Sequence, residues 1–147
     1  MIAQISFALA ALVFANTAIA LTPTEQANKE VVLNFYNEAI NNKNADAAIK
    51  LLGPKYIQHN PRAGDGGEAL RGLINIFKSN SPLLKGEVKR VIVEGDLVVL
   101  HVHSRPTPDA LGNAIVDIFR VENGLIVEHW DVIQPVPEKS ANTNTMF

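Results

Sequence analysis

The fold is decided by residues 114–134, AIVDIFRVENGLIVEHWDVIQ. Val and Ile recur through this segment, apolar and polar positions alternate, and Asn123-Gly124 stands between its two halves. This pattern is typical of two antiparallel strands joined by a tight turn. We therefore expect strands at 114–121 and 125–134, and the pairing of these strands determines which side chains share a face.

Two pairings of this hairpin can be written. A two-residue turn at Asn123-Gly124 pairs Asp117 with Trp130 and mixes charged and apolar residues on each face. A three-residue loop with a left-handed bulge at Gly124 pairs Asp117 with His129 and gathers the apolar residues. Folding selects the register that keeps the apolar set together, so the sequence favours the bulged form. Its expected inner face is Ile115, Asp117, Phe119, Val121, Leu125, Val127, His129, Asp131 and Ile133.

This register places three ionisable groups, Asp117, His129 and Asp131, on one apolar surface. A buried carboxylate without a partner costs on the order of several kcal/mol, so a protein that keeps these groups there either pairs them or uses them. Carboxyls placed together in a dry site have pKa values that move apart, so that one is a base and the other holds a proton. Such groups can remove a proton beside a carbonyl and return one to oxygen. The alternative is purely structural: Asp117 and His129 bond each other, and Asp131 lies at a solvated strand end.

The rest of the chain predicts helices before the hairpin and two more strands. Thr22-Pro23-Thr24-Glu25 is typical of a helix start with a capping box. The apolar spacing predicts that this helix continues to Ile40. A second helix is expected at 46–52, ended by Gly53-Pro54, and an extended segment follows at 56–59. A third helix is expected after the loop 63–67, and its apolar stripe is Leu70, Leu73, Ile74 and Phe77. Two further strands are expected at 88–94 and 97–105. Helices followed by an antiparallel run indicate an α+β domain with helices on one face of the sheet.

Composition limits the function. The chain has 147 residues, which is the length of one domain, and its 47% apolar residues can build a core. The net charge is −2, with no basic block, so nucleic acid is not expected as a partner. There are no cysteines, which excludes disulfides, thiolate metal sites and a cysteine nucleophile.

The N-terminus predicts export. Residues 5–15 are almost entirely apolar, and Ala18-Ile19-Ala20 follows as a small-x-small site. This layout is typical of a secretory signal peptide, although no Lys or Arg precedes the apolar run. We expect residues 1–20 to be a signal peptide cleaved after Ala20, and residues 21–147 to form the mature, secreted or periplasmic domain without a membrane anchor.

The other histidines suggest a ligand or a metal. His101 and His103 are two apart on one expected strand and therefore share a face. With His59 or His129 as a third ligand they could bind zinc, but the third ligand has no fixed short spacing. One of them could instead donate a hydrogen bond in the pocket. His59-Asn60-Pro61 lies in a loop, where it either meets a ligand or forms a turn through the Asn60 side chain.

Several blocks of the sequence resemble the SnoaL-like proteins of the nuclear-transport-factor-2-like superfamily. They are residues 28–32 with 35–36, 56–61, 100–104, 116–120 with Gly124, 128–135 and 140–142. The resemblance implies a cone-shaped α+β domain with a pocket between a curved sheet and the helices, and frequent dimers through the outer sheet face. The polyketide cyclases of this family catalyse an intramolecular aldol reaction without a metal or organic cofactor. Asp131 resembles their acid/base aspartate, whereas Asp117 stands where they have a histidine. The branch that this chain most resembles is described as aldol-condensing.

From these observations we expect a cofactor-independent acid/base enzyme, an aldol-type cyclase, isomerase or lyase, that acts on a small apolar carbonyl compound and forms a homodimer. Asp131 would be the general base, and Asp117 or His129 would protonate or hydrogen-bond the carbonyl oxygen. The expected ligand contacts are His59, Asn60, His101, His103 and Phe119, and no metal ligand is expected. The alternative is a non-catalytic protein that binds a small apolar ligand.

Overall fold

The computed structural model describes residues 20–147, so nearly all of the expected signal peptide lies outside the described residues. The described chain runs through α1 (Pro23–Tyr36), a π-helical turn η1 (Asn37–Asn41), α2 (Ala45–Ile49), β1 (Leu52–Gln58), α3 (Gly66–Asn80), β2 (Lys85–Glu94), β3 (Leu97–Arg105), β4 (Asn113–Glu122) and β5 (Leu125–Pro135). None of the helices described is both long enough and apolar enough to cross a membrane.

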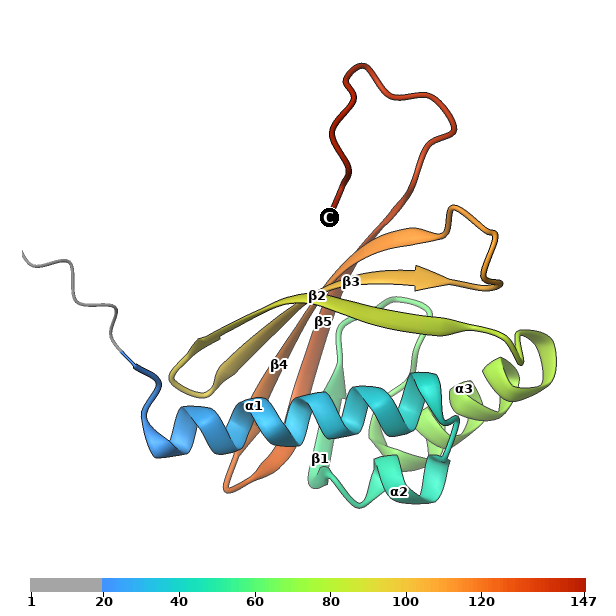
Figure 1. The fold of residues 1–147 in the computed structure, drawn as a ribbon. Coiled ribbons are helices and arrows are strands. Elements are labelled where there is room, and N and C mark those ends of the chain that lie inside the picture. The colour runs from blue at the N-terminus through green and yellow to red at the C-terminus, as the bar shows by residue number, and fades with distance from the viewer. Residues whose placement is uncertain (1–19) are drawn as a thin grey trace, which may run out of the picture.

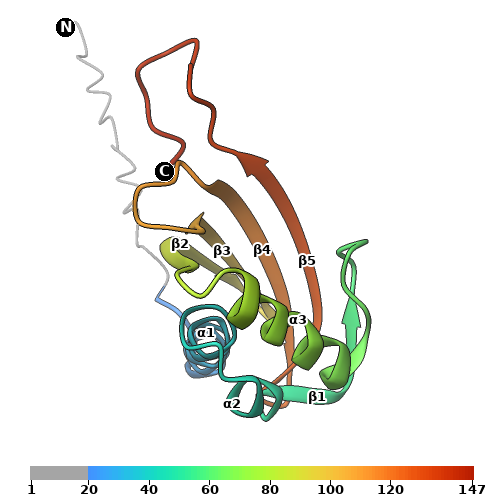
Figure 2. The same ribbon diagram turned by 90° about the vertical axis from the view of Figure 1, so that its right-hand side faces the viewer.

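The helices cover the concave face of one curved, open sheet (Figures 1 and 2). The strand order is β1-β5-β4-β3-β2. Strands β2 to β5 pair antiparallel, as the sequence predicts. β1 joins at the edge, parallel to β5, so the five-stranded sheet is mixed. The expected α+β architecture, with N-terminal helices packed on a curved sheet, is confirmed.

The first helix begins as the sequence indicates. The Thr22 hydroxyl oxygen accepts a hydrogen bond from the Glu25 backbone N–H at 3.2 Å. The Glu25 carboxylate in turn accepts one from the Thr22 backbone N–H at 2.8 Å. These two bonds satisfy helix-end donors that would otherwise lack partners. The predicted capping box is therefore present, and it fixes where α1 starts beneath the sheet.

The second helix ends earlier than predicted. Helix α2 stops at Ile49, and Gly53-Pro54 lies inside strand β1 instead of terminating a helix. Proline is tolerated here because β1 is an edge strand, where a missing N–H need not break a ladder bond. A Cβ on Gly53 would lie 2.8 Å from Cγ1 of Val127, so the glycine also allows β1 to approach β5 closely.

The predicted register of the β4–β5 hairpin is wrong. Asn123 and Gly124 have φ values of 52° and 75°, and Glu122 pairs with Leu125 across a two-residue turn. Positive φ at both central residues is the type I′ geometry that Asn-Gly favours and that matches strand twist. The bulge lies further along: Val121 pairs with Ile126 but Arg120 pairs with Glu128, which leaves Val127 as the extra residue.

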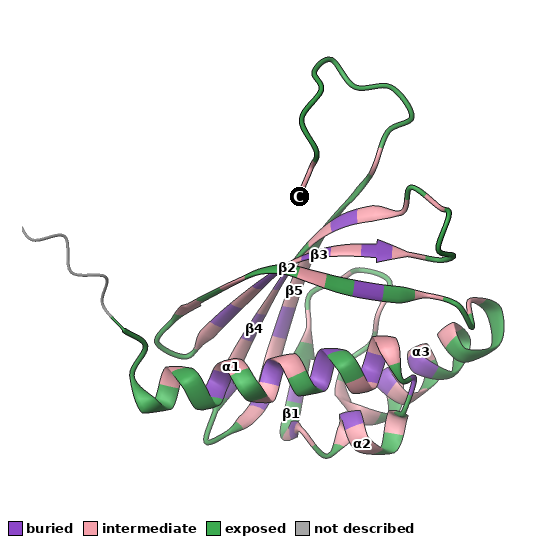
Figure 3. Cartoon of the chain, viewed as in Figure 1, coloured by how far each residue is buried: buried purple, intermediate pink, exposed green. Residues whose placement is uncertain are grey.

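The displaced bulge keeps most of the predicted inner face. Beyond it, Asp117 pairs with Asp131 instead of His129, a shift of two residues that preserves the side on which each side chain lies. All predicted inner residues of the hairpin except Leu125 and Val127 keep their face, and Ile126 takes their place with 0% exposure. Burying Ile126 provides the physical reason for the bulge. Figure 3 shows buried positions alternating with less buried ones along the strands.

Candidate active site

A cavity of about 380 Å³ lies between the helices and the concave face of the sheet. Its wall is mostly apolar, and α3 contributes the predicted stripe of Leu70, Leu73, Ile74 and Phe77. On the opposite side Phe119 of β4 is 2% exposed, and its ring meets that of Phe35 edge to face at 5.7 Å between centroids. Most of the polar residues of the wall come from β4, β5, and β1 with the loop that follows it, so the cavity has an apolar bulk and a polar end on this side.

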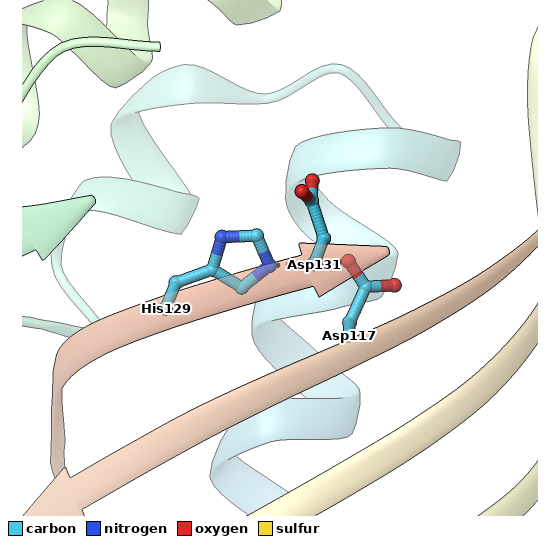
Figure 4. Close-up of side chains that lie close together, drawn as sticks. All are labelled: Asp117, His129 and Asp131. Atoms are coloured by element: carbon cyan, nitrogen blue, oxygen red, sulfur yellow. Dashed lines mark hydrogen bonds and ion pairs between the residues drawn. The ribbon is translucent and has the colours of Figure 1, made fainter. Parts of the chain in front are cut away.

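Asp117 and His129 form a buried pair at that end of the cavity (Figure 4). They are 6% and 7% exposed, and Nε2 of His129 lies 3.1 Å from Oδ1 of Asp117. The second oxygen of Asp117, Oδ2, is buried without a hydrogen-bond partner among the described residues. Burial therefore raises the pKa of Asp117, the hydrogen bond to His129 opposes this rise, and the nearby charge of Asp131 adds to it.

Asp131 is less buried and is held in place by Asn60. The Asn60 amide Nδ2 donates to both Asp131 oxygens, at 2.9 and 2.7 Å. The amide is itself oriented because its Oδ1 accepts the backbone N–H of Arg62 at 2.8 Å. Asn60 thus forms the turn considered for it and also lines the cavity. Asp131 is a carboxylate fixed in orientation beside the Asp117–His129 pair, where it also lines the cavity.

The predicted convergence of Asp117, His129 and Asp131 is present. One potential ligand atom from each lies within 4.8 Å of the others. Two carboxylates and an imidazole suit a divalent cation as a donor set. Here, however, Nε2 of His129 already bonds Asp117, and the Asn60 amide is bound to both Asp131 oxygens. Carboxyl and imidazole groups this close together are chemically able to exchange protons.

Two tyrosines and a glutamine also line the cavity, and none of the three was predicted from the sequence. Tyr56 and Gln58 lie on β1, and the Gln58 amide Nε2 donates to the Tyr56 hydroxyl at 3.2 Å. Tyr36, which is the last residue of α1, also lines the cavity. Burial, with a smaller contribution from the charge of Asp117, raises the pKa of both phenols. Both therefore stay protonated at neutral pH and remain able to donate a hydrogen bond.

The alternation of side chains along an extended strand could have predicted the two residues on β1, Tyr56 and Gln58. Residues 56, 58 and 60 are two apart, so in extended backbone they share one face. By the same rule His59 faces the other way. Its Nε2 lies 2.8 Å from Oε1 of Glu128, and its ring stacks on that of Trp130 with 4.6 Å between the ring centroids. His59 does not line the cavity, which corrects its expected role as a ligand contact.

His101 and His103 are also corrected, because they lie on the outer face of the sheet. Nδ1 of His101 is 3.0 Å from a guanidinium nitrogen of Arg90, and Nε2 of His103 is 2.8 Å from the carbonyl oxygen of Leu111. The ring of Phe147 stacks on both, with centroids 5.5 and 4.1 Å away. The sheet separates them from His129, and among the described residues neither belongs to a group of three potential metal ligands. The considered zinc site, with His59 or with His129 as the third ligand, is therefore not assembled.

Comparison with known proteins identifies the family. A SnoaL-like domain matches residues 32–129 of this chain. The chain belongs to the SnoaL-like family. No protein of curated function matches this SnoaL-like protein by sequence.

Solved structures share the fold at low identity. TsrD from Streptomyces laurentii is 23% identical over 78% of this chain and 91% of its own, with a TM-score of 0.62. A proposed SnoaL-like polyketide cyclase from Jannaschia sp. CCS1 is 22% identical over 79% and 91%, with a TM-score of 0.66. A proposed ketosteroid isomerase from Kribbella flavida DSM 17836 is 13% identical over 80% and 85%, with a TM-score of 0.65. At these identities the likeness establishes the nuclear-transport-factor-2-like fold alone.

Proposed function

We propose that this SnoaL-like protein is a cofactor-independent acid/base enzyme that acts on a small apolar carbonyl compound by aldol-type cyclisation, isomerisation or lyase chemistry. One observation carries the proposal: the oriented Asp131 carboxylate lines an apolar cavity directly beside a buried, hydrogen-bonded Asp117–His129 pair. Such chemistry requires one group that takes a proton from carbon and another that gives a proton or a hydrogen bond to oxygen.

In the proposed reaction Asp131 removes a proton from the carbon next to the carbonyl. The electron pair of the broken C–H bond moves toward the carbonyl, whose oxygen becomes an enolate oxygen. Because Tyr56 accepts from the Gln58 amide, its own O–H can donate to that oxygen, and the Asp117–His129 pair holds a proton nearby. Donors fixed in advance stabilise developing negative charge without reorganisation. The proton on Asp131 then returns to carbon, which completes an isomerisation. In an aldol reaction the enolate carbon instead attacks a second carbonyl, the π bond of that carbonyl breaks, and its oxygen takes up the proton.

Exchange of carbon-bound protons tests this proposal without knowledge of the natural substrate. The bicyclic ketone 2-tetralone is incubated with the protein in D₂O, and loss of its α-proton signals is followed by NMR. We expect the wild type to accelerate exchange and Asp131→Asn to lose about 10² of that acceleration or more. Asp109→Asn, an exposed loop aspartate, is the matched control. An Asp131→Asn variant that exchanges protons as fast as the wild type removes Asp131 from the mechanism.

The apolar cavity also supports the second candidate, a non-catalytic ligand carrier. A carrier would bind 2-tetralone with similar affinity before and after Asp131→Asn and would not accelerate exchange in either form. Mass spectrometry of small molecules that copurify with the protein then identifies the ligand class for either function.

We also propose that the protein forms a homodimer through the outer face of the sheet. Val132, Ile92 and Val116 carry large apolar side chains that are 70%, 62% and 39% exposed. Val116 pairs directly with Val132, and Ile92 lies on the same face of the sheet. Exposed apolar groups clustered on one face are typical of an interaction surface.

A further inference from the structure

Gln58 forms a hydrogen bond with the His129 ring, and this bond determines which ring nitrogen carries a proton. The orientation of the Gln58 amide is fixed by the chain: its Oε1 lies 3.0 Å from the backbone nitrogen of Asn60, which can only donate. Its Nε2 is directed at the Tyr56 hydroxyl. An amide turned the other way would place two donors against each other, so the atom that faces Asn60 is the oxygen.

The same oxygen fixes the proton on one nitrogen of His129. Oε1 of Gln58 lies 2.9 Å from Nδ1 of His129. An amide oxygen can only accept, so Nδ1 carries a proton whether the ring is neutral or charged. A neutral ring then presents the lone pair of Nε2 to Asp117, whose Oδ1 is 3.1 Å away. The hydrogen bond between Asp117 and His129 therefore contains a single proton that the two residues share.

We propose that Gln58 is a positioning residue, which holds His129 with its proton on Nδ1 so that Nε2 and Asp117 share one proton beside the base Asp131. Without this acceptor, the ring proton of His129 can shift from Nδ1 to Nε2, and Nε2 then donates it to Asp117. The site then no longer contains the acidic proton that the two residues share. A triad aspartate that orients a catalytic histidine acts by the same logic. The assignment of the tautomer depends only on geometry, and its catalytic consequence rests on the proposed function.

Nitrogen NMR of the histidine rings tests the assignment directly. In ¹⁵N-labelled protein, long-range ¹H–¹⁵N correlation spectra identify which ring nitrogen is protonated, and a His129→Gln variant assigns the signals of this ring. We expect Nδ1 of His129 to be protonated in the wild type. In Gln58→Leu the proton should move wholly or partly to Nε2. Gln58→Glu keeps an acceptor oxygen and should keep the proton on Nδ1. Gln134→Leu, which changes an exposed glutamine of the same sheet, is the matched control.

Two results would overturn the proposal: a wild-type His129 with an unprotonated Nδ1, or a Gln58→Leu spectrum identical to that of the wild type. The first needs no variant, so the test survives if Gln58→Leu fails to fold. Exchange of 2-tetralone protons should fall on the order of 10²-fold in Gln58→Leu and recover in part in Gln58→Glu. If the spectra behave as expected but the wild type exchanges no protons, the proposed function fails and the positioning role of Gln58 stands.

Discussion

Replacing Asp117 with Asn tests whether the buried carboxyl is protonated. If Asp117 is neutral, Asn is a close mimic: its Nδ2 donates to Nε2 of His129 in place of the carboxyl O–H, and one oxygen stays unpartnered as in the wild type. The number of hydrogen bonds is unchanged, so we expect the free energy of unfolding at pH 7 to change by less than about 1 kcal/mol. If Asp117 is instead ionised against an imidazolium, Asn leaves a buried charge without a partner and destabilises the protein by about 3–5 kcal/mol.

The pH dependence provides a second test of the same prediction. Burial raises the pKa of Asp117 in the folded protein, so the folded state holds this proton more tightly than the unfolded state. The resulting stabilisation is fully present below the unfolded pKa of about 3.9 and is lost as the pH rises through the raised folded pKa. The stability of the wild type relative to Asp117→Asn should therefore fall as the pH rises from about 4 toward neutrality.

Urea unfolding measured at a series of pH values gives both the free-energy cost of Asp117→Asn at pH 7 and the pH dependence of the wild type's stability relative to this variant. Trp130 is the only tryptophan of the chain and lies on β5, next to His129, so its fluorescence reports on the relevant strand. Asp109→Asn controls for the loss of an exposed charge. A neutral Asp117 is ruled out if Asp117→Asn costs several kcal/mol at pH 7 while the stability of the wild type relative to this variant rises with pH.

Two further substitutions test the packing around the site and the outer face. Gly86→Ala places a Cβ in steric overlap with the Tyr36 hydroxyl oxygen, so the buried Tyr36 ring must move. We expect the protein to lose about 1–3 kcal/mol of stability in thermal unfolding and to bind 2-tetralone more weakly. An unchanged melting curve would contradict this packing. Val132→Glu puts a charge on the proposed dimer face and should convert the dimer to a monomer in light scattering coupled to size exclusion, while the melting temperature stays close to that of the wild type. A wild type that is monomeric at all concentrations would rule out the dimer.

Much of the fold could be predicted from local sequence. The capping box at Thr22 and the alternating Val and Ile residues of β2 to β5 are signals contained within a few consecutive residues, because helix ends and strand faces depend on near neighbours. The grouping of Asp117, His129 and Asp131 was predictable for the same reason, since residues two apart on a strand share a face. It survived an incorrect register because the true pairing differs by two residues.

The errors arose where distant segments decide the outcome. Gly53-Pro54 resembles a helix stop, and it lies in a strand only because β5 offers an edge at which a missing N–H is tolerated. The bulge lies at Val127 instead of Gly124 because Ile126 is thereby buried under the helices. Local pattern cannot supply either reason, because each depends on which surface the folded chain presents to that residue.

Local sequence was enough to predict that helices precede an antiparallel run of strands, that the chain has no cysteine chemistry, and that two acids and an imidazole share one face. Packing of the folded chain was needed to show that Asn60 holds Asp131, that Gln58 sets the protons of His129, and that three histidines lie on the outer side of the sheet: His59, His101 and His103. The physical reason is that side-chain alternation is a property of one strand, whereas hydrogen-bond partners and burial arise when β1, from a separate part of the chain, packs parallel to β5.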